Sequence, residues 1–114
     1  MKTLEEVLAI MDARVDRATL ENYIAREWVR PQQERQEWYF EEIDIARAQL
    51  VSHLVQDIEV NDEGIDVALS LLDQLYGLRA QMRHLTYAIT QQPSEVQADI
   101  TLIVGELVKA GNKH

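Results

Sequence analysis

The sequence predicts a mainly α-helical protein, with a winged helix-turn-helix domain at residues 1–60 and a dimerisation region at residues 61–114. Apolar residues recur at helical spacing along most of the chain. The run Trp38-Tyr39-Phe40 favours a strand, and a polar segment precedes it, as in a small β-hairpin wing. Capping signals divide the dimerisation region into a long helix (61–90) and a short C-terminal helix (94–110).

The first 30 residues predict two short helices joined by a turn. Thr3 and Glu6 form a capping-box pair that begins a helix ending near Met11. After a turn at residues 12–14, Asp16 is placed to cap a second helix. The predicted inner face of that helix carries Leu20, Tyr23 and Ile24. Two such helices in succession indicate a helix-turn-helix.

The next segment predicts the wing. Pro31 ends the preceding helix because a residue before proline is pushed toward extended geometry. The polar run 32–37 then separates Trp28-Val29 from Trp38-Tyr39-Phe40, and we interpret these two groups as the strands of the hairpin. We expect Trp28 and Phe40 in the core and Trp38 on the surface.

Three further helices follow. One begins at Glu41 and ends near Asp57, Asn61 caps the long helix, and Ser94 with Gln97 forms a capping box for the last helix. The long helix has a seam of apolar residues at alternating steps of three and four: Ala68, Leu71, Leu75, Leu78, Met82, Leu85 and Ile89. A second apolar face carries Ile65, Leu69, Leu72 and Tyr76. This pattern favours a homodimer through a coiled-coil seam, with a three-helix bundle inside one chain as the alternative.

Composition narrows the function classes. Eleven Lys and Arg against twenty Asp and Glu give a net charge of −9, which opposes nonspecific DNA binding and favours a basic partner. The absence of cysteine excludes disulfides and thiolate metal sites. The histidines, His53, His84 and His114, are far apart in sequence, so we predict no catalytic residues, metal or cofactor. No apolar run is long enough for a membrane span, and we expect a cytoplasmic protein.

Several motifs resemble those of the MerR group of regulators. Val15-Asp16-Arg17-Ala18-Thr19-Leu20 resembles the start of the second helix of that group, and Trp28-Val29-Arg30-Pro31 resembles its exit into the wing. Phe40-Glu41-Glu42-Ile43-Asp44-Ile45 is similar to the start of the third helix, and Val60-Asn61-Asp62-Glu63-Gly64-Ile65 to the start of the fourth. This resemblance covers roughly residues 4 to 75 and implies the same winged fold.

Three positions depart from the MerR pattern. Glu21 and Trp38 stand where regulators of that group typically carry arginines that contact the DNA backbone, and Glu27 replaces a turn glycine. An acid and an indole cannot make charge-assisted contacts to phosphate, and the acid repels it. The resemblance therefore implies the fold while making direct DNA binding doubtful.

A narrower family accounts for both the matches and the departures. Glu37-Trp38-Tyr39-Phe40-Glu41-Glu42 and the segment 64–73 resemble the wing and fourth helix of CbpM-type chaperone modulators. This resemblance covers about residues 15 to 90. It implies a non-enzymatic modulator that binds the J-domain of a CbpA-type DnaJ co-chaperone and inhibits its co-chaperone and DNA-binding activities.

A J-domain presents a basic helix to the chaperone DnaK, so acidic residues are the candidate contacts. We expect them near the wing and the turn between the third and fourth helices, together with one aromatic residue: Glu37, Trp38, Glu41, Glu42, Asp57, Glu59, Asp62, Glu63 and Asp66. Acids in first helical turns also stabilise a helix without any partner. The alternative function, a MerR-family DNA-binding regulator, would depend on the cations of the helix-turn-helix and wing: Arg14, Arg17, Arg26, Arg30 and Arg35.

Overall fold

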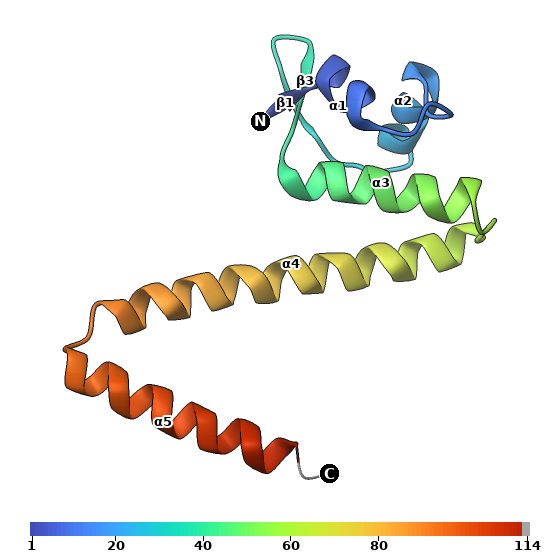
Figure 1. Cartoon of the computed structure of the whole chain (residues 1–114). Helices are drawn as coiled ribbons and strands as arrows, with labels where there is room; N and C mark the ends of the chain where they lie inside the picture. Colours follow the sequence, from blue (N-terminus) through green and yellow to red (C-terminus); the bar gives the residue numbers. More distant parts are fainter. Residues whose placement is uncertain (113–114) are drawn as a thin grey trace. The chain divides into compact units, whose positions relative to one another are not determined.

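The computed structural model describes residues 1–112 (Figure 1). The chain divides into two compact units, one of residues 1–76 and one that begins at residue 77. The described residues form five helices and three short strands. In chain order these are β1 (Lys2–Thr3), α1 (Leu4–Ile10), α2 (Arg17–Ala25), β2 (Gln32–Glu34), β3 (Glu37–Phe40), α3 (Glu42–Gln56), α4 (Asp62–Thr90) and α5 (Ser94–Gly111). The predicted mainly α-helical fold with a hairpin wing is confirmed.

The first two helices begin at their predicted caps. The Thr3 hydroxyl accepts a hydrogen bond from the Glu6 backbone N–H at 3.3 Å, and the Glu6 carboxylate accepts the Thr3 backbone N–H at 3.1 Å. The Asp16 carboxylate accepts the Thr19 backbone N–H at 2.8 Å. These bonds satisfy amide groups that have no partner in the first turn of a helix.

A left-handed residue ends α2. Glu27 has φ 61°, its N–H donates to the carbonyl of Ile24 (2.9 Å), and the N–H of Trp28 donates to the carbonyl of Tyr23 (3.0 Å). The rings of Tyr23 and Trp28 lie 6.1 Å apart. This is a Schellman motif with its hydrophobic contact, and it places glutamate at the position that usually holds glycine.

The three strands form one antiparallel sheet in the order β1-β3-β2. Arg35 and Gln36 connect β2 to β3 with φ values of 50° and 68°, as a two-residue type I′ hairpin turn requires. The prediction that Trp28-Val29 supplies the first wing strand is wrong. These two residues are buried in the core directly after the Schellman motif, and the polar segment Gln32–Glu34 pairs with β3 through its backbone instead.

The core of the first unit draws on α1, α2, β3, α3 and the beginning of α4. Its largest fully buried side chains are Phe40, Leu20, Ile65, Val7, Val29 and Val51. Trp28 and Phe40 are buried as expected, whereas Trp38 is half-buried and packs against the core. Trp38 and Phe40 are two residues apart in β3, so both side chains point to the same face of the sheet.

The helix α4 has two different environments along its length. The Asn61 side chain accepts the Gly64 N–H at 2.8 Å, which confirms Asn61 as its cap. Ile65 and Leu69 are buried in the first unit, while the seam residues between Leu71 and Leu85 are each more than half exposed. The exposed seam residues are Leu71, Leu75, Leu78, Met82 and Leu85.

The second unit contains the end of α4 and the helix α5. The predicted capping box of Ser94 and Gln97 is wrong, because Pro93 occupies the N-cap and no side chain caps this helix. Gln97 instead donates its amide to the carbonyls of Gln92 (2.7 Å) and Thr90 (3.4 Å) in the preceding turn. Most large apolar residues of α5, including Leu102, Ile103 and Leu107, are exposed, and Ile100 is half-buried.

Candidate functional site

The candidate contact residues form two groups at opposite ends of α3. We call Glu37, Trp38, Glu41 and Glu42, on β3 and at the start of α3, the wing-end group. The corner group lies where α3 ends and α4 begins, and comprises Asp57, Glu59, Asp62, Glu63 and Asp66. The 15 residues of α3 separate the two groups by about 22 Å. The nine predicted residues therefore lie in two separate groups.

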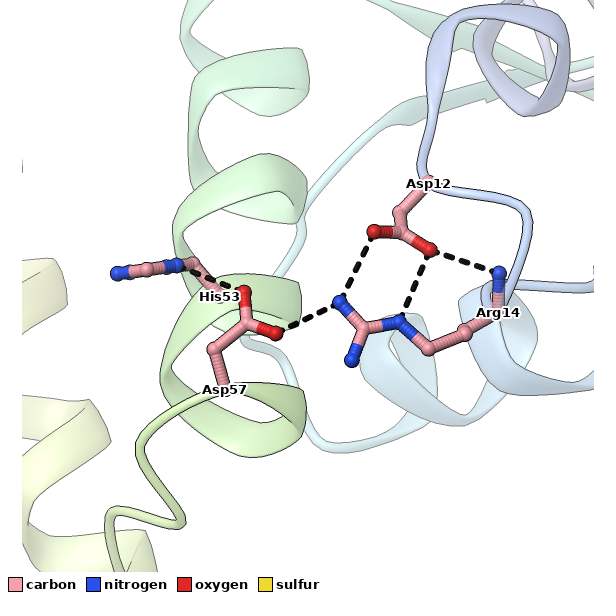
Figure 2. A network of polar contacts seen from close by, with 4 residues as sticks. All are labelled: Asp12, Arg14, His53 and Asp57. Carbon is pink, nitrogen blue, oxygen red and sulfur yellow. Dashed lines mark hydrogen bonds and ion pairs between the residues drawn. The ribbon is translucent and has the colours of Figure 1, made fainter.

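Asp57 of the corner group is already bound within the chain (Figure 2). Its carboxylate accepts hydrogen bonds from Arg14 at 2.7 Å and pairs with His53 at 2.9 Å. The same guanidinium binds Asp12 through Nε and Nη2, at 3.0 and 2.9 Å. Hydrogen bonds from the Arg14 side chain and backbone lower the pKa of Asp12 to about 2, and hydrogen bonds from Arg14 and His53 also lower the pKa of Asp57.

Asp62 and Asp66 bind the end of the helix-turn-helix. Arg26 donates to Asp62 at 2.8 Å, and its guanidinium carbon lies 4.8 Å from the centre of the Trp28 ring. The Trp28 indole N–H donates to Asp66 at 3.3 Å. Of the corner group, only Glu59 and Glu63 lack a side-chain partner within residues 1–112. Three of the five carboxylates in the corner group therefore make contacts within the chain that stabilise the fold.

A buried arginine completes this junction. The Arg47 guanidinium donates to the carbonyl of Trp28 at 2.7 Å and to Asp73 at 2.6 Å, and it approaches the Glu27 carbonyl at 3.5 Å. Only 5% of the Arg47 side chain is exposed. These residues line a polar cavity of about 390 Å³ that also includes Arg30 and Ser70. Sequence reasoning missed the Arg47–Asp73 pair, although a cation on the apolar face of a predicted helix was a usable signal.

The wing-end group has few internal partners. The Tyr39 hydroxyl donates to Glu37 at 3.1 Å, and this hydrogen bond and the charge of Glu37 raise the pKa of Tyr39. Glu37 also lies directly opposite Glu34 in the hairpin, and like charges in facing positions destabilise a strand pair. Glu41 and Glu42 are exposed and form no ion pair within the described residues. Among the described residues, Glu41 and Glu42 are thus unpaired acids at this end of α3, as Glu59 and Glu63 are at the other end.

The cations of the helix-turn-helix are largely neutralised. Arg14 binds Asp12 and Asp57, and Arg26 binds Asp62. Arg17 binds Glu5 and Glu21, each at 3.0 Å. Within residues 1–112, Arg30 and Arg35 alone among the five candidate DNA contacts have no carboxylate partner. The carboxylates beside Arg14, Arg17 and Arg26 offset the positive charge that these residues would present to a phosphate.

Metal-binding clusters and membrane-spanning helices are absent from the described part of the chain. Residues 1–112 contain no cluster of His, Asp or Glu placed to hold a metal ion. Likewise, none of the helices described here is both long and apolar enough to cross a membrane.

The arrangement of two short helices, a hairpin wing and a third helix ahead of a long helix defines a winged helix-turn-helix protein. A family model described as "MerR HTH family regulatory protein" matches residues 4–86. The chain belongs to this MerR family.

Curated relatives add a narrower similarity. The chaperone modulatory proteins CbpM of Coxiella burnetii strains Dugway 5J108-111 and RSA 331 / Henzerling II are each 35% identical to this chain over 48 residues. That segment is 42% of this chain, and it spans less than half, 45%, of each relative. The resemblance to MerR-like proteins of the CbpM type is confirmed. No solved structure matches the chain.

Proposed function

We propose that this protein is a chaperone modulator that binds the J-domain of a CbpA-type DnaJ co-chaperone and inhibits its co-chaperone and DNA-binding activities. The observation that carries the proposal is the neutralisation of Arg14, Arg17 and Arg26 by carboxylates within a winged helix-turn-helix of net negative charge. Such a surface repels nucleic acid and attracts a basic protein surface. The similarity to proteins named CbpM supports the same proposed function.

Inhibition follows from competition. A J-domain uses a basic helix to engage DnaK, so an acidic protein that covers this helix blocks the stimulation of DnaK. No covalent chemistry is needed, and the protein acts as a stoichiometric ligand in the cytoplasm. Its effect weakens as salt increases, because contacts between exposed charges are screened.

The test combines the protein with the CbpA homologue of its host and DnaK, and measures ATP hydrolysis. We expect the J-domain-stimulated rate to fall toward the basal rate as this protein approaches equimolar amounts with CbpA. Isothermal titration with the isolated J-domain measures the complex directly. If the stimulated rate does not change and titration detects no complex, the proposed function is wrong.

We also propose that the active form is a homodimer joined through the seam of α4. Five large apolar side chains of the seam are exposed, and so are Leu102, Ile103 and Leu107 of α5. Contiguous apolar surface of this kind usually marks an interface. Alternating steps of three and four are the spacing that keeps such residues against a second helix.

Arg30 and Arg35 favour one alternative function, a DNA-binding regulator with a reduced set of contacts. Neither forms an ion pair in the described chain, and both belong to the wing region. A gel shift on the protein's own promoter in low salt tests this function, with the double charge reversal Arg30→Glu and Arg35→Glu as the matched variant. The regulator requires a shift that the variant abolishes, so the absence of any shift excludes it.

A further inference from the structure

The apolar cavity at the start of α3 is a candidate docking site. It has a volume of about 430 Å³ and is lined by Met1, Lys2, Phe40, Glu41, Glu42 and Ile45. Phe40 is fully buried, whereas Met1 is 74% exposed. The strand β1, of two residues, forms one side through its pairing with β3. The cavity thus offers apolar walls beside two exposed carboxylates.

We propose that this cavity and its acidic rim are the place where the protein receives its partner. The occupant is an aliphatic or aromatic side chain carried by a basic segment of the J-domain, with the flanking cations next to Glu41 and Glu42. The inference rests on the proposed function, and it assigns the contact to the wing-end group rather than to the corner group.

Three of the five corner carboxylates are already engaged, and only Glu59 and Glu63 of that group are unpaired in residues 1–112. At the corner, Asp57, Asp62 and Asp66 already accept hydrogen bonds from Arg14, Arg26 and the Trp28 indole. A partner's cation would share these carboxylates with the groups already bound, so it gains less there than at an unpaired carboxylate. At the wing end, Glu41 and Glu42 form no ion pair in residues 1–112, so a cation there adds a charge pair. The Glu41 side chain also takes part in the capping box of α3 with Asp44, whereas Glu42 is engaged by no side chain of the described residues.

The cavity offers an apolar contact that ion pairs alone do not provide. Binding energy at protein interfaces is concentrated in buried apolar anchors, while charged groups at the rim mainly determine orientation and association rate. Near the corner, the cavity beside Arg47 is lined mainly by charged groups, including Arg26, Arg30 and Asp73. At the wing end, two acids unpaired within the described chain border an apolar cavity.

The positive charge of Lys2 allows binding at this cavity to be tested with two substitutions of opposite expected effect. It lines the same cavity and carries the only positive side chain there. A basic partner is repelled by Lys2 and attracted by Glu42. Reversing Lys2 should therefore strengthen binding, and reversing Glu42 should weaken it.

The experiment is isothermal titration of the full-length protein with the isolated J-domain. We expect Glu42→Lys to raise Kd about tenfold and Lys2→Glu to lower it about threefold. The matched control is Glu63→Lys, because Glu63 is also an exposed acid in a first helical turn without an ion pair. It should leave Kd within about twofold, since the two substitutions affect their helices equally.

A second measurement tests the apolar anchor. In a methyl-labelled sample, titration with the J-domain should shift the Ile45 methyl signal, and Ile45→Ala should weaken binding several-fold while circular dichroism confirms the fold. If the J-domain binds but Glu63→Lys impairs binding as much as Glu42→Lys, or if the Ile45 signal does not move, the assigned docking site is wrong and the proposed function stands. If the wild-type protein does not bind the J-domain, both fail together.

Discussion

Replacing Glu27 with glycine should stabilise the protein. Glu27 has φ 61° at the end of α2, and a left-handed conformation costs a residue with a side chain about 1–2 kcal/mol. Glycine removes this strain but adds about 0.4–1 kcal/mol of unfolded-chain entropy. The Glu27 side chain forms no hydrogen bond or ion pair in residues 1–112, so its loss removes no contact there. We expect a net gain of about 1 kcal/mol in the free energy of unfolding.

Chemical denaturation at one fixed protein concentration measures this gain. A thermal scan should show Tm rising by roughly 4 °C. Gln49→Gly is the matched control, because Gln49 is exposed in the middle of α3 and glycine there should cost about 0.5–1 kcal/mol. Glu27→Val should destabilise, since a branched side chain tolerates positive φ least. An unchanged or lower stability of Glu27→Gly would refute the strain argument.

Three further predictions concern the seam, the buried arginine and acid stability. The double substitution Leu78→Asp and Met82→Asp should give a monomer by light scattering, since it places charges in the exposed seam, and a dimer that persists would contradict the proposed interface. Asp73→Ala leaves buried Arg47 without its carboxylate and should lower the free energy of unfolding, measured with denaturant, by roughly 2 kcal/mol. This value is discounted for solvent screening because Asp73 is 43% exposed. A decrease smaller than the measurement error would show that solvent compensates the charge of Arg47. Asp12→Asn should be less stable than wild type at pH 7, and the difference should vanish as the pH falls from about 4 to 2. The reason is that the folded-state pKa of Asp12 is lowered from 3.8 to about 2, so its stabilisation is present above pH 3.8 and lost on protonation; a difference that persists below pH 2 would assign the effect to something other than charge.

The local signals in the sequence predicted the helix starts well. Thr3, Asp16 and Asn61 cap their helices as expected, because a cap depends on residues three or fewer positions away. The strand β2 was missed because Gln32–Glu34 is polar throughout and has no propensity signal. Its pairing with β3 follows from the two-residue turn between them.

The candidate site was predicted less completely, since its charge balance depends on contacts between distant residues. Arg14 meets Asp57 across 43 positions and Arg26 meets Asp62 across 36. No local pattern in a single sequence indicates such pairs. Residue types alone therefore identified the acidic candidates but did not separate those already bound from those left free. The cavity beside Ile45 was likewise invisible, because it arises where β1 and α3 come together.

The helix α4 is one continuous helix whose first turns and later turns are stabilised differently. Its first turns share the core of residues 1–76, so they open only when that unit unfolds. Its later turns have exposed apolar side chains, and an isolated helical segment of this length is marginal in water. If a second chain covers the seam, mass action protects those later turns, whereas the core of residues 1–76 holds the first turns at any protein concentration. Hydrogen exchange in the later turns would then slow as the protein concentration rises, while exchange in the first turns would not change.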